Sequence, residues 1–283
     1  TSSVGIVQDS SVFGDINEVA ISASNVIYVA GQKGFFYSTD GGVTFIEETI
    51  SSTGTLAAMD VKIATNGDIY YSAGAKTSST SAVYYSSGLF TFTAITPTVI
   101  TNRGRIEIAP SPVDPNYVYL SIAKQKTIGT GTVNTSSGGI SAVLVSNTKG
   151  TSWSIMSLGT PQFDPLTAGS KGVGDFANTI VGDPIKADAC YLGGDVFYAW
   201  SQIASNPLGQ GSWFQIGINF PLPFAFYIHS NVHSVIFNGG NGSMYIATDG
   251  GIFKSVSNNS GFLPYNNGLN ISQFNSVAFP NFP

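Results

Sequence analysis

Charged residues are scarce in this sequence, and basic residues are the scarcest. Only 10% of the 283 residues are Asp, Glu, Lys or Arg, whereas a soluble domain usually has about 25%. The 11 Lys and Arg face 16 Asp and Glu, which leaves a net charge of −5. Nucleic acid and anionic lipid are bound through clustered positive charge, so we expect neither as a partner.

Cysteines and long apolar runs are also lacking. Cys190 is the single cysteine, which excludes a disulfide within the chain, and its setting in ADACYLGG indicates a buried strand position rather than a reactive thiol. No apolar run approaches the ~20 residues of a membrane-spanning helix, so we expect no membrane insertion. The chain starts at Thr1 without a signal-peptide pattern, and we expect a processed product or part of a longer polypeptide.

A unit of two short strands is present five times along the chain. Its first strand carries a Tyr among apolar residues, at Tyr28, Tyr70, Tyr119, Tyr191 and Tyr245. Its second strand is apolar as well, at residues 34–38, 82–86, 142–146, 195–199 and 251–255. Repetition of this kind indicates a repeat architecture. We predict one all-β domain over 1–283, a β-propeller with blades at about 14–48, 55–97, 105–157, 175–217 and 227–268 and a partial blade at 271–283.

The turn after the first unit has the most specific pattern. Residues 38–45, STDGGVTF, fit S-x-D-x-G-x-T-F/W, in which the Asp caps its own turn, the Gly accepts positive φ and the aromatic packs between sheets. The pattern resembles the Asp-box of sialidase-like, xyloglucanase-like and sortilin-type β-propellers. The matching residues are Ser38, Asp40, Gly42, Thr44 and Phe45, and in a weaker copy Ser146, Gly150 and Trp153. The resemblance implies a fold rather than an activity.

Residues 227–279 resemble something narrower. YIHSNVHSVIFNGGNGSMYIATDGGIFKS, followed by NNGLNISQFNSVAF, is similar to repeats of large secreted and surface propeller proteins of Bacteroidetes. This resemblance implies an exported module, often one part of a larger adhesin-like protein, without a defined activity.

The two ends of the chain bear on how the propeller closes. Residues 4–7 are a short apolar run that we expect to form an extra edge strand, and residues 271–280 are typical of the inner strand of a sixth repeat. Either the N-terminal strand joins this last one in a thin blade, or the natural polypeptide continues. We favour the second, because an unclosed ring leaves sheet edges open.

Candidate catalytic residues are few. A sialidase site needs three arginines, and the chain has only Arg103 and Arg105. A xyloglucanase-like site needs two facing carboxylates, for which Asp60 and Glu107 on predicted inner strands are the candidates. A strand with one polar face would have the same pattern. We expect Asp183 and Asp188, which flank a Pro turn, to be turn caps.

Two histidines alternate with an amide in IHSNVHSV. In an extended strand His229, Asn231 and His233 would face one side, but zinc needs another strong ligand and the chain has no further His. We therefore predict hydrogen bonding near the blade entrance and neither metal nor cofactor. Asp249 starts an Asp-Gly-Gly that we interpret as a hairpin turn.

Aromatic residues between the fourth and fifth repeats offer a better binding candidate. They are Trp200, Trp213, Phe224, Phe226 and Tyr227. Such side chains stack on sugars or anchor protein partners, although propellers also bury aromatics between blades. The scarcity of titratable groups favours a non-catalytic extracellular or cell-surface module that binds a protein or a polysaccharide. The alternative is a glycoside hydrolase of xyloglucanase-like type that uses Asp60 and Glu107.

Overall fold

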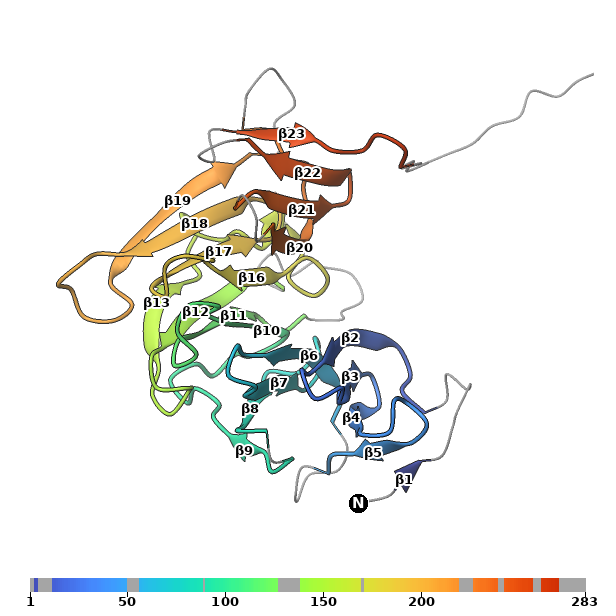
Figure 1. Ribbon diagram of the computed structural model, residues 1–283. Helices are drawn as coiled ribbons and strands as arrows, with labels where there is room; N and C mark the ends of the chain where they lie inside the picture. The colour runs from blue at the N-terminus through green and yellow to red at the C-terminus, as the bar shows by residue number, and fades with distance from the viewer. Residues whose placement is uncertain are drawn as a thin grey trace, which may run out of the picture.

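The structure is a computed structural model that describes residues 3–4, 12–49, 56–88, 90–126, 138–168, 171–218, 226–238, 242–256 and 261–269. Within these ranges every regular element is a β-strand, and no helix long and apolar enough to cross a membrane is found. The strands form five antiparallel sheets of four or five strands and one small hairpin (Figure 1). The predicted all-β propeller is confirmed as a five-blade arrangement.

Each blade is a meander whose strands follow one another from the inner to the outer edge. The first blade has β2 (Ile16–Ile21), β3 (Ile27–Gly31), β4 (Gly34–Ser38) and β5 (Phe45–Glu47), and β1 (Ser3–Val4) pairs outside β5. The second has β6 (Ala58–Ile63), β7 (Ile69–Ala73), β8 (Ala82–Ser86) and β9 (Thr93–Ala94). The third has β10 (Ile106–Pro110), β11 (Val118–Ala123), β12 (Ile140–Ser146) and β13 (Ser154–Leu158).

The last two blades have the same order. The fourth has β16 (Thr179–Gly182), β17 (Ala189–Gly193), β18 (Phe197–Gln202) and β19 (Gly211–Gly217). The fifth has β20 (Val232–Phe237), β21 (Met244–Thr248), β22 (Gly251–Ser255) and β23 (Phe262–Pro264). Between the third and fourth blades, β14 (Thr167–Ala168) and β15 (Lys171–Gly172) form the small hairpin.

Four of the five repeated tyrosines, Tyr28, Tyr70, Tyr119 and Tyr191, lie in the cores between blades, whereas Tyr245 lies on the outer face of the fifth blade. Four apolar clusters separate successive sheets, one for each pair of neighbouring blades. Tyr28, Tyr70 and Tyr119 are at most 2% exposed, and the Tyr119 hydroxyl donates to Ala187 O of the next blade at 2.6 Å. Cys190 is fully buried in the same way. Sheets covered on both sides explain why the second and third strands are apolar along their whole length.

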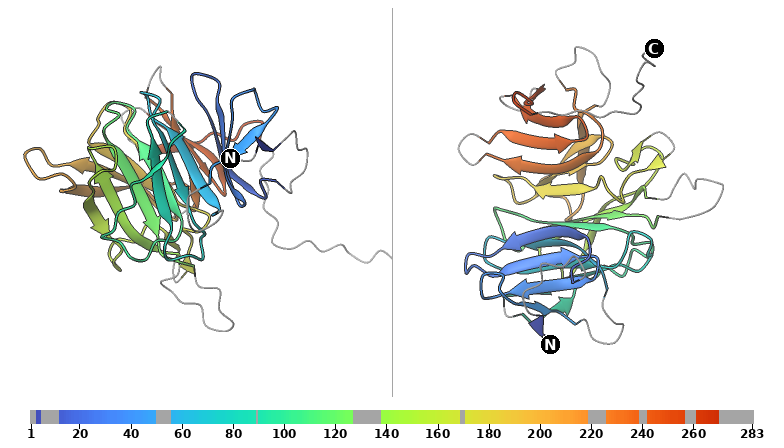
Figure 2. Two further views of the ribbon diagram at one scale, coloured as in Figure 1. Left: turned by 90° about the horizontal axis from the view of Figure 1, so that it is seen from below. Right: turned by 90° about the vertical axis from the view of Figure 1, so that its right-hand side faces the viewer.

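The five blades form an arc whose two ends do not pack together. The inner strands β2, β6, β10, β16 and β20 contact one another in that order, and among the described residues β20 makes no comparable contact with β2. Figures 1 and 2 show the first and fifth blades at the two ends of this arc. The predicted edge strand is present as β1, which includes Val4 of the apolar run, and residues 5–7 lie outside the described residues. The predicted sixth repeat lies outside the described residues.

The outer face of the fifth blade is mostly apolar and packs on no other sheet of the described residues, although Tyr265 contacts Tyr245 there at a centroid distance of 5.6 Å. Ile236, Tyr245, Lys254 and Leu263 lie side by side across its four strands. Ile236 is 63% and Leu263 is 60% exposed. In the other blades the corresponding face packs on a neighbouring sheet.

Candidate functional site

Asp60 connects two blades through both of its carboxylate oxygens. It lies on β6, is 1% exposed, and follows a register shift in the pairing of β6 with β7. Lys62 Nζ donates to Oδ1 at 2.6 Å, and the backbone N–H of Ile108 on β10 donates to Oδ2 at 2.7 Å. The carboxylate of Asp60 therefore serves as the acceptor for a backbone N–H of the third blade and links the second blade to it.

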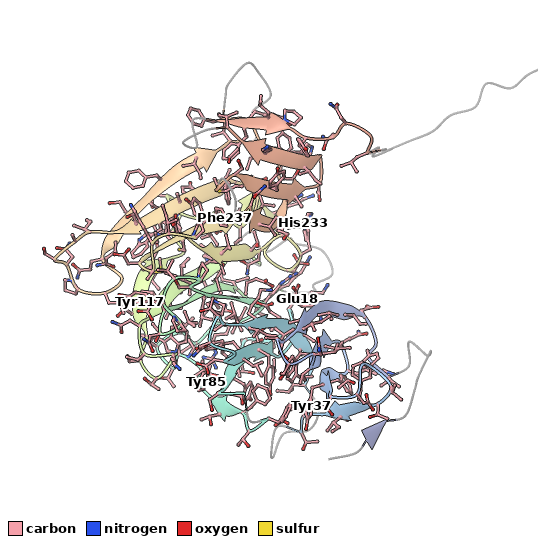
Figure 3. The ribbon with its side chains drawn as sticks, viewed as in Figure 1. Glu18, Tyr37, Tyr85, Tyr117, His233 and Phe237 are labelled. Carbon is pink, nitrogen blue, oxygen red and sulfur yellow. The ribbon has the colours of Figure 1, made fainter. Side chains whose placement is uncertain are left out.

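Glu107 is the centre of a second buried ion pair. It lies on β10, is 8% exposed, and accepts from Arg105 Nε at 2.6 Å. Burial raises the pKa of Glu107 to about 7, with the negative charge of Asp60 adding to the effect and Arg105 opposing it. Lys62 joins the two pairs to the first blade, because its ammonium also lies 3.3 Å from Glu18 Oε1. Figure 3 labels Glu18 on β2 of that blade.

The cations of this network are held strongly. Burial alone would lower the pKa of Lys62, but the charges of Asp60, Glu107 and Glu18 raise it above its ordinary value. The pKa of Arg105 is raised mainly by Glu107. Each acid thus has a permanent positive partner two residues away on its own strand face.

Neither Asp60 nor Glu107 lines any of the three cavities that contain Asp175, Phe92 and Trp153, respectively, in their walls. A glycosidase, in contrast, must present both carboxyl groups to its substrate. The spacings Asp60-x-Lys62 and Arg105-x-Glu107 already contain this signal, since residues two apart in a strand share a face. The chain's other arginine, Arg103, donates its Nε–H to the backbone oxygen of Ser81 at 2.7 Å.

A cavity of about 280 Å³ with a mixed polar and apolar lining lies where the first three blades meet the segment before the fourth. Its lining side chains come from loops and strand ends of several blades: Asp15, Asn17, Gln32, Lys76, Arg105 and Asp175. The sequence did not indicate this group, because turn residues of these types are common and only the ring brings them together. Arg105 alone was singled out beforehand, for a different role.

Asp175 is the most buried polar group of the cavity. It is 9% exposed, Lys126 Nζ donates to its Oδ2, and Arg105 Nη1 donates to its backbone oxygen at 3.2 Å. Its other carboxylate oxygen, Oδ1, is buried and has no hydrogen-bond donor.

The fifth blade holds a second, more exposed polar cluster around Asp249. His233 Nε2 lies 2.6 Å from Asp249 Oδ1, and Asn231 Nδ2 donates to Oδ2 at 2.8 Å. Burial would raise the pKa of Asp249, but hydrogen bonds from His233 and Asn231 lower it overall. Asp249 is therefore a partner of these side chains as well as a turn residue.

The three side chains of IHSNVHSV do not line up on one strand face, contrary to the prediction. Asn231 has φ of 60°, and β20 begins only at Val232. The His229 ring lies instead over Gly250, where a Cβ would come within 2.4 Å of it. The predicted hydrogen-bonding role is confirmed for Asn231 and His233. Within the described residues no group of three metal-binding side chains occurs.

The aromatic candidates do not form one surface. Trp200 is 2% exposed, and it lies opposite the partly buried Trp213 in the pairing of β18 with β19, in the core shared by the third and fourth blades. Tyr227 is partly buried against Phe253 at 5.7 Å. Phe226 is 43% exposed, and Phe224 lies outside the described residues. The expected exposed platform is thus wrong for the two tryptophans, because alternation turns them towards a blade.

The predicted turn caps at Asp40 and Asp183 are confirmed, while the one at Asp188 stays a prediction. Asp40 Oδ1 accepts from Ser38 Oγ at 2.8 Å and from Thr44 N at 2.9 Å, and hydrogen bonds from Thr44 and Ser38 lower the pKa of Asp40 to about 2. Gly42 has φ of 90° and donates its N–H to Ser38 Oγ at 2.8 Å. Phe45 packs edge-on against Phe13 with a centroid distance of 4.9 Å.

The weaker copy of the turn has the same hydrogen bonds with a hydroxyl in place of the carboxylate. Gly150 N donates to Ser146 Oγ at 2.9 Å, and Ser152 N donates to Thr148 Oγ1 at 3.0 Å. Trp153 donates its ring N–H to Ile95 O of the preceding blade at 2.7 Å. Asp183 also caps its turn, accepting from Ile185 N and Lys186 N, each at 2.9 Å.

The chain matches no family model and no curated protein. Among solved structures it is similar to an ancestral GH74 enzyme, with a TM-score of 0.61, 18% identity, and 91% of this chain covering 32% of that one. It is also similar to the GH74 xyloglucanase from Xanthomonas campestris, with a TM-score of 0.60, 14% identity, and 93% covering 39%.

A third similar structure is PorZ of Porphyromonas gingivalis, a bacterial surface component of the type-IX secretion system. Its TM-score is 0.55 at 12% identity, and 87% of this chain covers 33% of PorZ. The chain therefore spans about a third of the length of these proteins. At these identities the likeness establishes the β-propeller fold.

Proposed function

We propose that this chain is a non-catalytic β-propeller module of an exported bacterial protein, secreted or at the cell surface, which binds a polysaccharide or a protein partner. The observation that carries the proposal is the state of its two candidate catalytic acids. Asp60 is 1% and Glu107 is 8% exposed, and each is ion-paired. A general acid and a nucleophile must reach the substrate, and these two groups bridge blades instead.

Two structural neighbours support the proposed setting. PorZ is described as a bacterial surface component, and the Xanthomonas protein as a xyloglucanase, so related folds serve at the surface and with polysaccharide. The turns at residues 38–45 and 146–153 support assigning the blades to the Asp-box type. The exposed apolar row on the fifth blade supports a place within a larger adhesin-like protein, in which a further blade would cover it.

A panel of plant and bacterial polysaccharides tests this function. Retention in affinity gel electrophoresis and release of reducing ends are measured for the parent chain, Asp60→Asn and Glu107→Gln, with folding checked by circular dichroism. We expect retention of at least one polysaccharide without new reducing ends. Cleavage by the parent chain that disappears in both folded variants would make it a hydrolase. If no polysaccharide is retained, the proposal of polysaccharide binding is wrong. Crosslinking on intact cells should then capture a protein partner.

A further inference from the structure

The cavity at the junction of the first three blades has the size of a small binding site. Its volume is about 280 Å³, at the lower end of the ~300–1,000 Å³ typical of small-molecule sites. Asn17 belongs to β2, Lys76 follows β7, and Asp175 precedes β16, so distant parts of the chain converge there. A cavity of this size has room for one ring of a ligand.

Asp175 has one carboxylate oxygen without a hydrogen-bond donor. Its side chain is 6% exposed, and its Oδ1 has no hydrogen-bond partner although Oδ2 is bound by Lys126. Buried polar atoms are almost always hydrogen-bonded, so a buried unpaired oxygen on a residue that lines a cavity needs an explanation. A ligand that donates a hydrogen bond to Oδ1 would provide one.

The charges of the lining select a neutral ligand. Asp15 and Asp175 are balanced by Lys76 and Arg105, so an anion would meet the acids and a cation the bases. Arg105 is moreover paired with Glu107 and Asp175 with Lys126, so Asp15 and Lys76 are the opposite charges that remain and balance each other. A neutral polyhydroxyl group suits this mixture, because each of its hydroxyls both donates and accepts a hydrogen bond.

The rest of the lining fits the carbon skeleton of such a ligand. Asn17 and Gln32 contribute amide groups that donate and accept, while Ala57, Met59 and Ala75 contribute small apolar surfaces. A sugar ring has this division between hydroxyl edges and C–H faces. We propose that the cavity binds one neutral sugar residue of a polysaccharide, as a chain end or side branch, with Asp175 Oδ1 accepting from a hydroxyl. This inference rests on the proposed glycan-binding function.

Saturation-transfer NMR with free D-glucose, D-galactose, D-mannose and D-xylose tests the site. We expect at least one of these sugars to bind the parent chain. Ala75→Leu, which fills the cavity without removing a polar contact, should abolish the signal. Asp175→Asn should weaken binding by roughly tenfold or more, since hydrogen bonds to charged groups are strong.

Asp183→Asn is the matched control for Asp175→Asn. Asp183 is also a buried acid, 8% exposed, but it caps a turn outside the cavity, so its variant should bind sugar like the parent chain. Circular dichroism of all three variants verifies folding. Asp175→Asn and its control still decide the question if Ala75→Leu does not fold.

The remaining outcomes separate this inference from the proposed function. If polysaccharide is retained equally by the parent chain and Ala75→Leu, the module binds glycan elsewhere and the cavity proposal is wrong. It is equally wrong if no free sugar binds, or if acetate or methylammonium binds in the cavity and sugars do not. If the parent chain retains no polysaccharide, the glycan-binding function fails first.

Discussion

Two polar clusters, each built around aspartate or glutamate carboxylates, play different parts in this propeller because one is buried and the other is exposed. Asp60, Lys62, Arg105 and Glu107 lie between the first three blades, and Asp60 is 1% exposed. The side chains of His233 and Asp249, on the fifth blade, are 38% and 34% exposed. A charge pair out of water is costly to break, whereas one in contact with water contributes little. The buried cluster therefore holds blades together, whereas the exposed cluster contributes only hydrogen bonds to the turn at Asp249.

The largest effect should come from the buried cluster. Asp60→Ala removes the acceptor of the buried Ile108 N–H and leaves the Lys62 ammonium with Glu18 alone, and we expect a loss of about 3 kcal/mol in the free energy of unfolding. Chemical denaturation measures it. The matched variant Asp249→Ala should lose no more than about 1 kcal/mol. Equal losses would show that burial does not separate the clusters.

Glu107→Gln should change how stability depends on pH. The folded protein raises the pKa of Glu107 from 4.5 to about 7, so it binds this proton more tightly than the unfolded chain does. The resulting stabilisation is complete below about pH 4.5 and is lost as pH rises through about 7. Between pH 4.5 and 8 the free energy of unfolding of the variant should therefore rise relative to that of the parent chain by on the order of 2 kcal/mol.

Denaturation of both proteins at several pH values measures this difference. Asp114→Asn, in an exposed turn, serves as the control and should follow the parent chain over this range. A constant gap between Glu107→Gln and the parent chain would contradict the prediction.

Asp249→Asn should show a pH dependence of the opposite sign and smaller size. Its partners lower the pKa of Asp249 below the ordinary 3.8, so its stabilisation is present above about pH 4 and is lost as pH falls below that. Thermal unfolding at pH 3 and pH 6 should therefore show the parent chain ahead of the variant at pH 6 and close to it at pH 3. If the parent chain exceeded the variant in melting temperature by more at pH 3 than at pH 6, the predicted direction of the pH dependence would be wrong.

Asp40 extends the comparison to a fully exposed carboxylate. The parent chain should lose the contribution of this turn as pH falls from about 3.8 towards about 2. Asp40→Ala should lower the melting temperature by less than Asp60→Ala does, because water replaces the lost hydrogen bonds.

Thr148→Asp should raise the melting temperature slightly, by placing a carboxylate where a hydroxyl now accepts from Ser152 N. A decrease with Thr148→Asp would show that the two turns are not equivalent.

Much of the fold could be predicted from residues close together in the sequence. A Tyr in an apolar segment, a second apolar segment and a Gly-containing turn are local signals, and they predicted strands such as β3, β7 and β11 and the capping by Asp40. Trp200 was misjudged, because its neighbourhood in sequence resembles a surface connection while the pairing with β19 turns it into a core. Strand alternation alone does not say which side a neighbouring blade covers.

The sequence by itself determined the repeat, its strands, its capped turns and the shortage of charge that argues against nucleic-acid binding. Only the tertiary structure decided that the Asp60 carboxylate accepts from the Ile108 N–H of another blade. It also decided that the His233 ring lies within hydrogen-bond distance of Asp249, and that the chain reaches this position through a positive φ at Asn231. It further brought Asp15 and Asp175 into the lining of one cavity. The physical reason is distance along the chain. Periodicity and turn chemistry act over a few residues, whereas a contact between blades depends on how the sheets pack around the ring.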